Sequence, residues 1–182
     1  MKVIFLDRDG VINEYPGDYR DVKNWKEFKF IPGSIEAIKK FNSKGFKLFV
    51  ISNQAGVSKG PYLEKTLKTI TKRMLNVLKR NHAYIGGVYY CIHKEEDNCL
   101  CRKPKTGLLH KSFEDFRISP EITFFIGDSF RDMKAARSSG AKTVLVLSGK
   151  EKLTNRKNWV FEPDYIFDNL LLASHYLCKH YG

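Results

Sequence analysis

Short runs of apolar and β-branched residues alternate with amphipathic stretches along the chain. Most runs are continuously apolar, which is typical of strands buried on both faces of a parallel sheet. They predict strands at 2–6, 47–51, 87–90, 123–126 and 143–147, with a weaker one at 165–167.

The amphipathic stretches predict helices between the strands. In 63–80, for example, apolar residues form one stripe and lysines lie opposite. The predicted helices are 34–42, 63–80, a short one within 129–140 that stops at Gly140, and 170–181. Strands that alternate with helices predict a doubly wound, Rossmann-like parallel α/β sheet.

Composition and length fit one ordinary globular domain. The 182 residues are 42% hydrophobic and 29% charged, which is enough for one sizeable core. There is neither an apolar run of membrane-spanning length nor a signal-peptide pattern. We therefore expect a single domain over 1–182, a cytoplasmic protein with no membrane partner, and a monomer.

The formal net charge of +12 favours anionic partners such as phosphorylated metabolites or nucleic acid. A lysine-rich solvated surface would give the same net charge, because the lysines are spread along the chain without a basic tail. Both interpretations stay open from charge alone.

Polar residues follow the predicted strands where ligands of a parallel sheet bind. Asp7 and Asp9 follow the first strand, and Asp128 follows the fourth, with Asp132 four positions further on. Three more polar residues follow the second strand: Ser52, Asn53 and Gln54. Each aspartate alone could be a turn former or helix cap, but several carboxylates at one edge would repel one another unless a cation intervened. We therefore predict a Mg²⁺ site formed by Asp7, Asp9 and Asp128, in which one of the first two could offer a backbone carbonyl.

Three cysteines and a histidine lie within eleven positions. Cys91, His93, Cys99 and Cys101 match the Cys₃His set of structural zinc sites. Zinc would order the charged zinc loop, residues 91–101, directly before Arg102 and Lys103. The alternative is a set of free thiols in a reducing cytosol; Cys178 is expected to be an ordinary buried cysteine.

Four motifs in order, "DRDGVIN", "SNQAG", "RKPKTG" and "GDSFRD", resemble those of the haloacid dehalogenase superfamily of phosphatases. The resemblance covers residues 5 to about 140. It implies that Asp7 attacks phosphorus to form an aspartyl-phosphate and that Asp9 is the general acid and base. Ser52 and Lys103 would hold the phosphoryl oxygens, and Asp128 would complete the Mg²⁺ site.

The cysteine pattern before "RKP" is similar to that of the D-glycero-D-manno-heptose 1,7-bisphosphate phosphatases and of the histidinol-phosphate phosphatases. The former commonly carry Ala-Arg-Gly where this chain has Ser58, Lys59 and Gly60, and a lysine where it has Ser129. Without an insertion for a cap domain, the loops 13–20 and 54–61 and the zinc loop would shape the pocket. Residues expected to bind the substrate or its phosphates are Ser52, Asn53, Gln54, Lys59, Arg102 and Lys103.

The leading hypothesis is a Mg²⁺-dependent phosphatase that releases the distal, 7-phosphate of a heptose bisphosphate. Histidinol phosphate is the nearest alternative substrate. A polynucleotide 3′-phosphatase is a second alternative because of "RKPKTG" and the positive charge, although the helix at 63–80 lacks aromatic residues for stacking bases. A zinc-stabilised binding module without activity is the non-enzymatic alternative.

Overall fold

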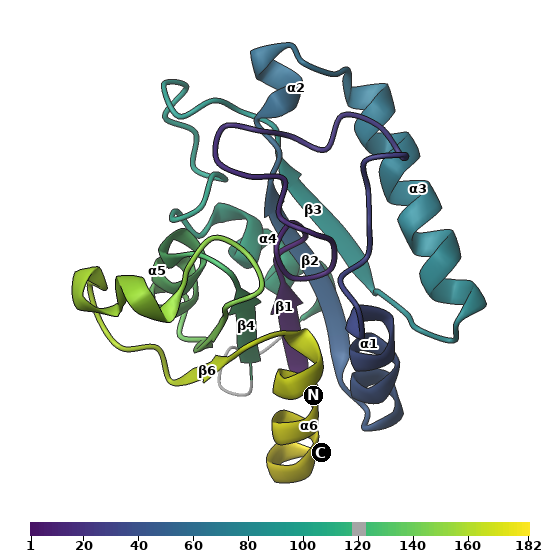
Figure 1. Cartoon of the computed structure of the whole chain (residues 1–182), viewed down its shortest axis with the longest axis vertical. Coiled ribbons are helices and arrows are strands. Elements are labelled where there is room, and N and C mark those ends of the chain that lie inside the picture. Colours follow the sequence, from purple (N-terminus) through teal and green to yellow (C-terminus); the bar gives the residue numbers. More distant parts are fainter. Residues whose placement is uncertain (118–122) are drawn as a thin grey trace.

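A six-stranded parallel sheet forms the centre of the molecule (Figure 1). The computed structural model describes residues 1–117 and 123–182. The strand order is β3-β2-β1-β4-β5-β6, and every neighbouring pair is parallel. The strands are β1 (Val3–Leu6), β2 (Lys47–Asn53), β3 (Gly87–Cys91), β4 (Thr123–Gly127), β5 (Lys142–Val146) and β6 (Tyr165–Phe167). The predicted doubly wound α/β fold is confirmed.

Helices cover both faces of the sheet. Their bounds are α1 (Ser34–Ser43), α2 (Gly56–Lys59), α3 (Glu64–Arg80), α4 (Gly107–Phe116), α5 (Phe130–Ser138), the 3₁₀ helix η2 (Leu153–Asn158) and α6 (Leu170–Tyr181). Buried residues of α1, α3 and α6 share one hydrophobic core, and those of α4 and α5 share another on the opposite face. The strands lie between two cores, which explains why most of them are continuously apolar.

Among the described residues, three helical segments were not predicted from the sequence: α2, α4 and η2. The helix α4 begins at Gly107, and its N-cap residue, Thr106, makes no side-chain capping bond. A threonine is a usual start signal, but the glycine that follows it is a poor helix former and weakens that signal in the sequence. The helix α2 has only four residues, too few for a periodic hydrophobic pattern.

The strand order reverses at β1, which places a ligand site beyond the carboxyl end of that strand. From β1 the chain builds outward through β2 and β3 on one side, and β4, β5 and β6 lie on the other. Parallel sheets bind ligands at such a switch point. All four residues of β1 are fully buried, so the strand holds its exit loop firmly.

Loops, and no separate cap domain, lie over the carboxyl ends of the strands in the described residues. In Figure 1 the segment between β1 and α1, the helix α2 and the segment after β3 cluster there. None of the helices within 1–117 and 123–182 combines the length and hydrophobicity needed to cross a membrane.

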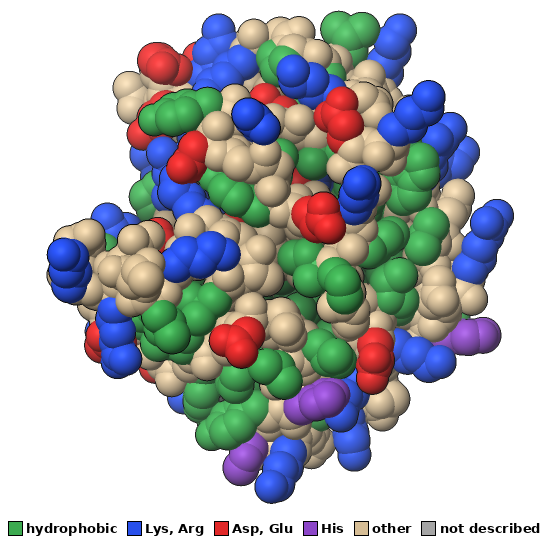
Figure 2. Space-filling model, viewed as in Figure 1, with side chains coloured by type: hydrophobic (Ala, Val, Ile, Leu, Met, Phe, Trp, Pro, Cys, Tyr) green, Lys and Arg blue, Asp and Glu red, His purple; other side chains and the backbone are tan. Residues whose placement is uncertain are grey.

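The positive charge is spread over the visible face of the molecule. Figure 2 shows lysine and arginine side chains over much of the visible face, interspersed with acidic ones. On this face the net charge of +12 has the appearance of a solvated surface, with no continuous basic track for a nucleic-acid strand.

Candidate active site

Three carboxylates converge at the carboxyl ends of β1 and β4. Asp7 follows β1, Asp128 follows β4, and Asp132 lies in the first turn of α5. Each offers an oxygen within 4.8 Å of the others. Asp7 and Asp128, which the sequence placed at one edge of the sheet, do meet there, and the structure adds Asp132 to them.

Lys103 lies between two of these carboxylates. Its side chain is buried, with Nζ 3.1 Å from Asp7 Oδ1 and 2.6 Å from Asp132 Oδ1. The ammonium also donates to the Ile51 carbonyl at 2.8 Å. Burial disfavours the charged ammonium, but the neighbouring carboxylates outweigh this and raise the pKa of Lys103. The residue is therefore a fixed cation at the edge of the sheet.

The charges of this group call for a divalent cation. Three carboxylates face one ammonium, which leaves two negative charges in a buried site. This excess of negative charge disfavours ionisation of the carboxyl groups. Burial raises the pKa of Asp7 to about 6; Lys103 opposes this rise, and Asp132 adds to it. Burial and the neighbouring carboxylates likewise raise the pKa of Asp128. Mg²⁺, which prefers carboxylate oxygens and water, fits this donor set and charge.

Two glycines leave room for the Asp128 carboxylate. A β-carbon at Gly10 or at Gly149 would overlap it, and Gly10 also has a φ of +80°, which favours glycine. The Lys150 backbone N–H donates to Asp128 Oδ2 at 2.8 Å. The carboxylate is thus held in one orientation by backbone on both sides.

The Asp9 side chain lies apart from the three carboxylates. Its oxygens accept hydrogen bonds from Arg8, Asn13 and Gln54. The side chain of Asp9 is therefore engaged elsewhere, and the predicted role of Asp9 as a metal ligand stays a prediction that depends on its backbone carbonyl.

The polar residues after β2 organise the site. Asn53 exchanges two hydrogen bonds with the backbone of Lys103, at 3.1 and 3.0 Å. Gln54 donates to Asp9 Oδ2 at 2.8 Å and to Ser52 Oγ at 3.2 Å. A hydrogen bond from the Ser52 hydroxyl to Asp7 favours the ionised carboxylate and so lowers the pKa of Asp7 against the effect of burial. Asn53 and Gln54 thus support other site residues; their predicted substrate contacts remain predictions.

Ser129, which replaces the commoner lysine, is a helix cap. Its backbone N–H and hydroxyl donate to Asp132 Oδ2 at 3.1 and 2.6 Å, forming a capping box at the start of α5. The same carboxylate reaches Lys103 through its other oxygen. Ser129 therefore orients Asp132 toward the site.

A polar cavity of about 490 Å³ opens over Lys103 and Asp9. Its walls come from the loop after β1, α2, the zinc loop, the start of α5 and the segment after β5. The cationic side chains in the lining are Arg20, Lys59, Lys103, Arg102, Arg131 and Lys150. Lys59 and Arg102 are among these cations, and their predicted contacts with a substrate stay predictions.

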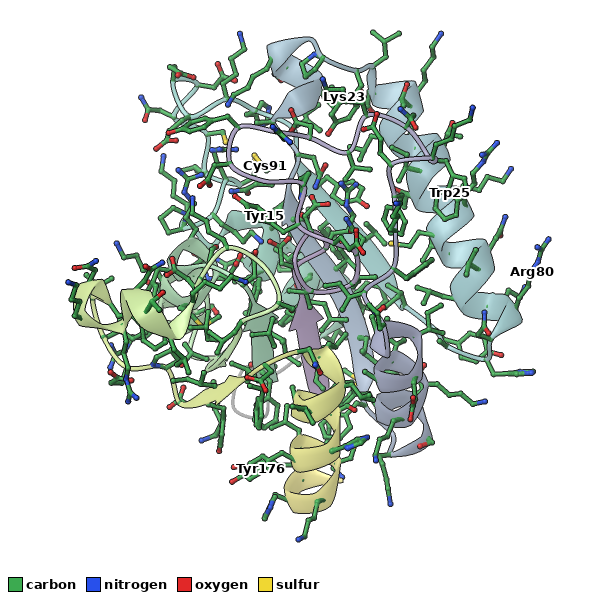
Figure 3. The ribbon with its side chains drawn as sticks, in the orientation of Figure 1. Tyr15, Lys23, Trp25, Arg80, Cys91 and Tyr176 are labelled. Atoms are coloured by element: carbon green, nitrogen blue, oxygen red, sulfur yellow. The ribbon has the colours of Figure 1, made fainter. Side chains whose placement is uncertain are left out.

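The four predicted zinc ligands form one cluster beside this cavity. The sulfur atoms of Cys91, Cys99 and Cys101 are 3.3 to 3.6 Å apart, and His93 Nδ1 is 3.2 Å from the Cys101 sulfur. Zn–S bonds of about 2.3 Å in a tetrahedron need sulfurs about 3.8 Å apart, so the set fits zinc closely. In Figure 3, Cys91 lies near the carboxyl end of the sheet, far from Tyr176 on α6.

The cluster is continuous with the segment that carries Lys103. Burial opposes ionisation of Cys99, but hydrogen bonds from Cys101 and Cys91 lower its pKa to about 7, which favours a thiolate. Cys101 is separated from Lys103 by one residue, and Asn53 holds the Lys103 backbone. Zinc would therefore fix the loop that carries Lys103 into the site.

We expect that Cys99→Ser removes most of the bound zinc and lowers the melting temperature. The variant keeps the rest of the loop sequence but loses one of four ligands, so the loop before Lys103 loosens. Metal analysis of the purified protein, with about one zinc per chain for the parent, and thermal unfolding check this. Cys178→Ser is the matched control, because Cys178 is buried outside the cluster and should retain the zinc. Full zinc content in Cys99→Ser would contradict the assignment.

Comparison with known proteins gives a consistent result. Residues 100–173 match the HAD-hydrolase-like family model. The chain is 39% identical over 170 residues to the D-glycero-beta-D-manno-heptose-1,7-bisphosphate 7-phosphatase of Pseudomonas putida, covering 93% of this chain and 95% of that protein. It is 35% identical over 181 residues to the protein of the same name from Neisseria meningitidis serogroup A, covering 98% and 96%.

A solved structure is also similar over nearly the whole chain. The D,D-heptose 1,7-bisphosphate phosphatase of B. bronchiseptica, complexed with magnesium and phosphate, has a TM-score of 0.92 and 29% identity, covering 98% of this chain and 99% of that one. The predicted resemblance is confirmed, and the chain belongs to the haloacid dehalogenase-like hydrolases, in the family of the D-glycero-beta-D-manno-heptose-1,7-bisphosphate 7-phosphatases.

Proposed function

We propose that the protein hydrolyses D-glycero-β-D-manno-heptose 1,7-bisphosphate to release the 7-phosphate, with Mg²⁺ as cofactor. The observation that carries this proposal is the convergence of Asp7, Asp128, Asp132 and Lys103 at the switch point of the sheet. The substrate is taken from the relatives of 35% and 39% identity. We further propose a single catalytic domain over 1–182, acting as a cytoplasmic monomer on a small phosphorylated metabolite.

In the first step, Asp7 attacks phosphorus while Asp9 protonates the leaving alkoxide. The P–O bond to the sugar breaks as the bond to the Asp7 oxygen forms. Lys103 holds the equatorial oxygens with its fixed ammonium, aided by the Ser52 hydroxyl. Asp7 and Asp128, with Asp132 beside them, would hold Mg²⁺, and the ion would supply the positive charge that lets an anionic phosphate approach a carboxylate.

In the second step, water hydrolyses the aspartyl-phosphate. Asp9, now ionised, accepts a proton from water as the water oxygen bonds to phosphorus. The bond to Asp7 breaks, inorganic phosphate leaves, and Asp9 regains its proton. One carboxyl group thus acts as acid and then as base.

The cavity supports a substrate with two phosphate groups. Its volume of about 490 Å³ is in the range of small-molecule sites. While one phosphate lies at Lys103, the other can reach Lys59 or Arg102 on the cavity wall. The basic charge of the chain is otherwise dispersed over the visible surface (Figure 2), which disfavours a polynucleotide substrate.

We expect kcat/KM for the heptose bisphosphate to exceed that for histidinol phosphate and for a 3′-phosphorylated oligonucleotide by about 100-fold or more. Histidinol phosphate has only one phosphate, so it loses the binding energy of the second cationic point. The oligonucleotide has many phosphates, but the visible face offers no continuous basic track for its backbone (Figure 2). Phosphate release with Mg²⁺ measures all three substrates, and Lys111→Met, an exposed position on α4, is a control that should not change the ranking. A preference for histidinol phosphate or the oligonucleotide would overturn the substrate assignment.

A further inference from the structure

Arg8 is a fully buried arginine between the two proposed catalytic aspartates, Asp7 and Asp9. Burying a guanidinium is costly unless a partner compensates. Here the partner is Asp9: Arg8 Nη2 lies 2.9 and 3.0 Å from the two carboxylate oxygens, and Nε lies 3.2 Å from one of them. Among the described residues, Nη1 has no hydrogen-bond partner, so the guanidinium directs its hydrogen bonds to Asp9.

The exit turn of β1 makes this contact possible. The Arg8 carbonyl accepts the backbone N–H groups of Ile12 and Asn13 at 2.8 and 3.1 Å, so the chain curls around it. Gly10, with its positive φ, permits the tight turn. Neighbouring side chains, which point to opposite faces in a regular strand, can therefore meet here.

Two aromatic rings hold the guanidinium in place. Its central carbon lies 5.9 Å from the ring of Phe28 and 5.8 Å from the ring of Tyr90. The Tyr90 hydroxyl is 3.0 Å from Thr71 Oγ1 on α3. Three separate parts of the chain, the loop after β1, the edge strand β3 and α3, thus fix the position of Arg8.

The remaining contacts of Asp9 complete a clamp. Asn13 Nδ2 donates to Oδ1 and Gln54 Nε2 to Oδ2, each at 2.8 Å. Gln54 is itself oriented by the Tyr62 hydroxyl, which donates to its side-chain oxygen at 2.9 Å. Both oxygens of Asp9 are therefore held, which fixes the direction of the carboxyl group relative to the cavity.

We propose that Arg8 is a positioning residue that aims the Asp9 carboxyl group at the leaving oxygen and then at the attacking water. The inference rests on the proposed function, because it requires Asp9 to transfer those protons. A plain structural role for Arg8 would affect all substrates alike. A positioning role affects most strongly those substrates whose leaving group needs a proton.

Arg8→Lys tests this with two phosphate esters and Mg²⁺. Lysine keeps the charge but loses the two-nitrogen fork. The leaving group of the heptose bisphosphate is a sugar alkoxide, which needs a proton. The leaving group of 4-nitrophenyl phosphate is 4-nitrophenolate, which is stable as an anion. We expect kcat/KM for the sugar ester to fall about 100-fold. For the aryl ester we expect kcat/KM to fall by about tenfold or less.

A double variant gives a second, independent reading. In the Asp9→Asn background, Arg8→Lys should cause no further loss with either ester, because Arg8 acts through Asp9. Should Arg8→Lys fail to fold, Gln54→Leu removes the other hydrogen bond to Asp9 Oδ2 and should give the same selective loss. Arg156→Lys is the matched control: Arg156 contacts Glu162 through two nitrogens at the surface and should leave both esters unaffected.

The outcomes separate the two proposals. Equal losses with both esters, or none, would overturn the role of Arg8 while the phosphatase assignment stands. A parent enzyme that hydrolyses neither ester would overturn the proposed function itself.

Discussion

Replacing Asp7 with asparagine is expected to lower turnover by about 10⁴-fold or more. The amide keeps the size of the side chain but cannot accept a phosphoryl group. Steady-state phosphate release with Mg²⁺ measures the loss, and rapid quenching with ³²P-labelled substrate shows whether label is retained on the protein. The parent should retain label and the variant should not.

The same variant is expected to fold at least as stably as the parent. Burial raises the pKa of Asp7 to about 6, so ionised Asp7 is unfavourable in the folded, metal-free protein. As the pH rises from about 4 to about 6, the unfolded chain is ionised at Asp7 while the folded chain still holds the proton, and stability is lost. Above about 6 the loss is complete.

Thermal unfolding without Mg²⁺, measured over this pH range, tests the expected loss of stability. The parent should lose more stability than Asp7→Asn as the pH rises. Asp115→Asn, an exposed position on α4, should keep both the activity and the pH dependence of the parent. Substantial turnover by Asp7→Asn would exclude an aspartyl-phosphate on this residue.

The strands and the zinc cluster could be predicted because their signals are local. Buried runs such as Val3–Leu6 are continuously apolar, and three cysteines with a histidine at close spacing are typical of a structural zinc site. Asp7 and Asp128 were predictable because parallel strands bring their carboxyl ends to one edge. These inferences need only the order of the chain and the general rules of the sheet.

The parts that were missed depend on three-dimensional contacts. Asp132 was visible in "GDSFRD", but its role follows from the capping box with Ser129 and the ion pair with Lys103. Asp9 was predicted as a metal ligand through either its side chain or its backbone carbonyl, but the contact of its side chain with Arg8 arises from a turn at Gly10. No sequence periodicity reports that turn.

Lys103→Met should be the next most damaging substitution, with kcat lowered by about 10³-fold. Methionine fills similar space but removes the ammonium that lies 3.1 Å from Asp7 and 2.6 Å from Asp132. The transferred phosphoryl group then loses its fixed positive partner. Lys103→Arg should not restore activity, because the planar guanidinium cannot replace a compact ammonium in this buried position.

Lys103→Met should also destabilise the protein in the absence of Mg²⁺. In this it should differ from Asp7→Asn, which is expected to be at least as stable as the parent. Removing one partner of a buried ion pair leaves the other charge uncompensated and costs about 3–5 kcal/mol. Denaturant unfolding without Mg²⁺ measures this cost, and adding Asp132→Asn should recover part of the stability without recovering activity. Lys111→Met, on the exposed side of α4, should change neither property. If Lys103→Met kept normal turnover, the ammonium would have no part in holding the phosphoryl group, and the cation for that group would have to come from elsewhere on the cavity wall.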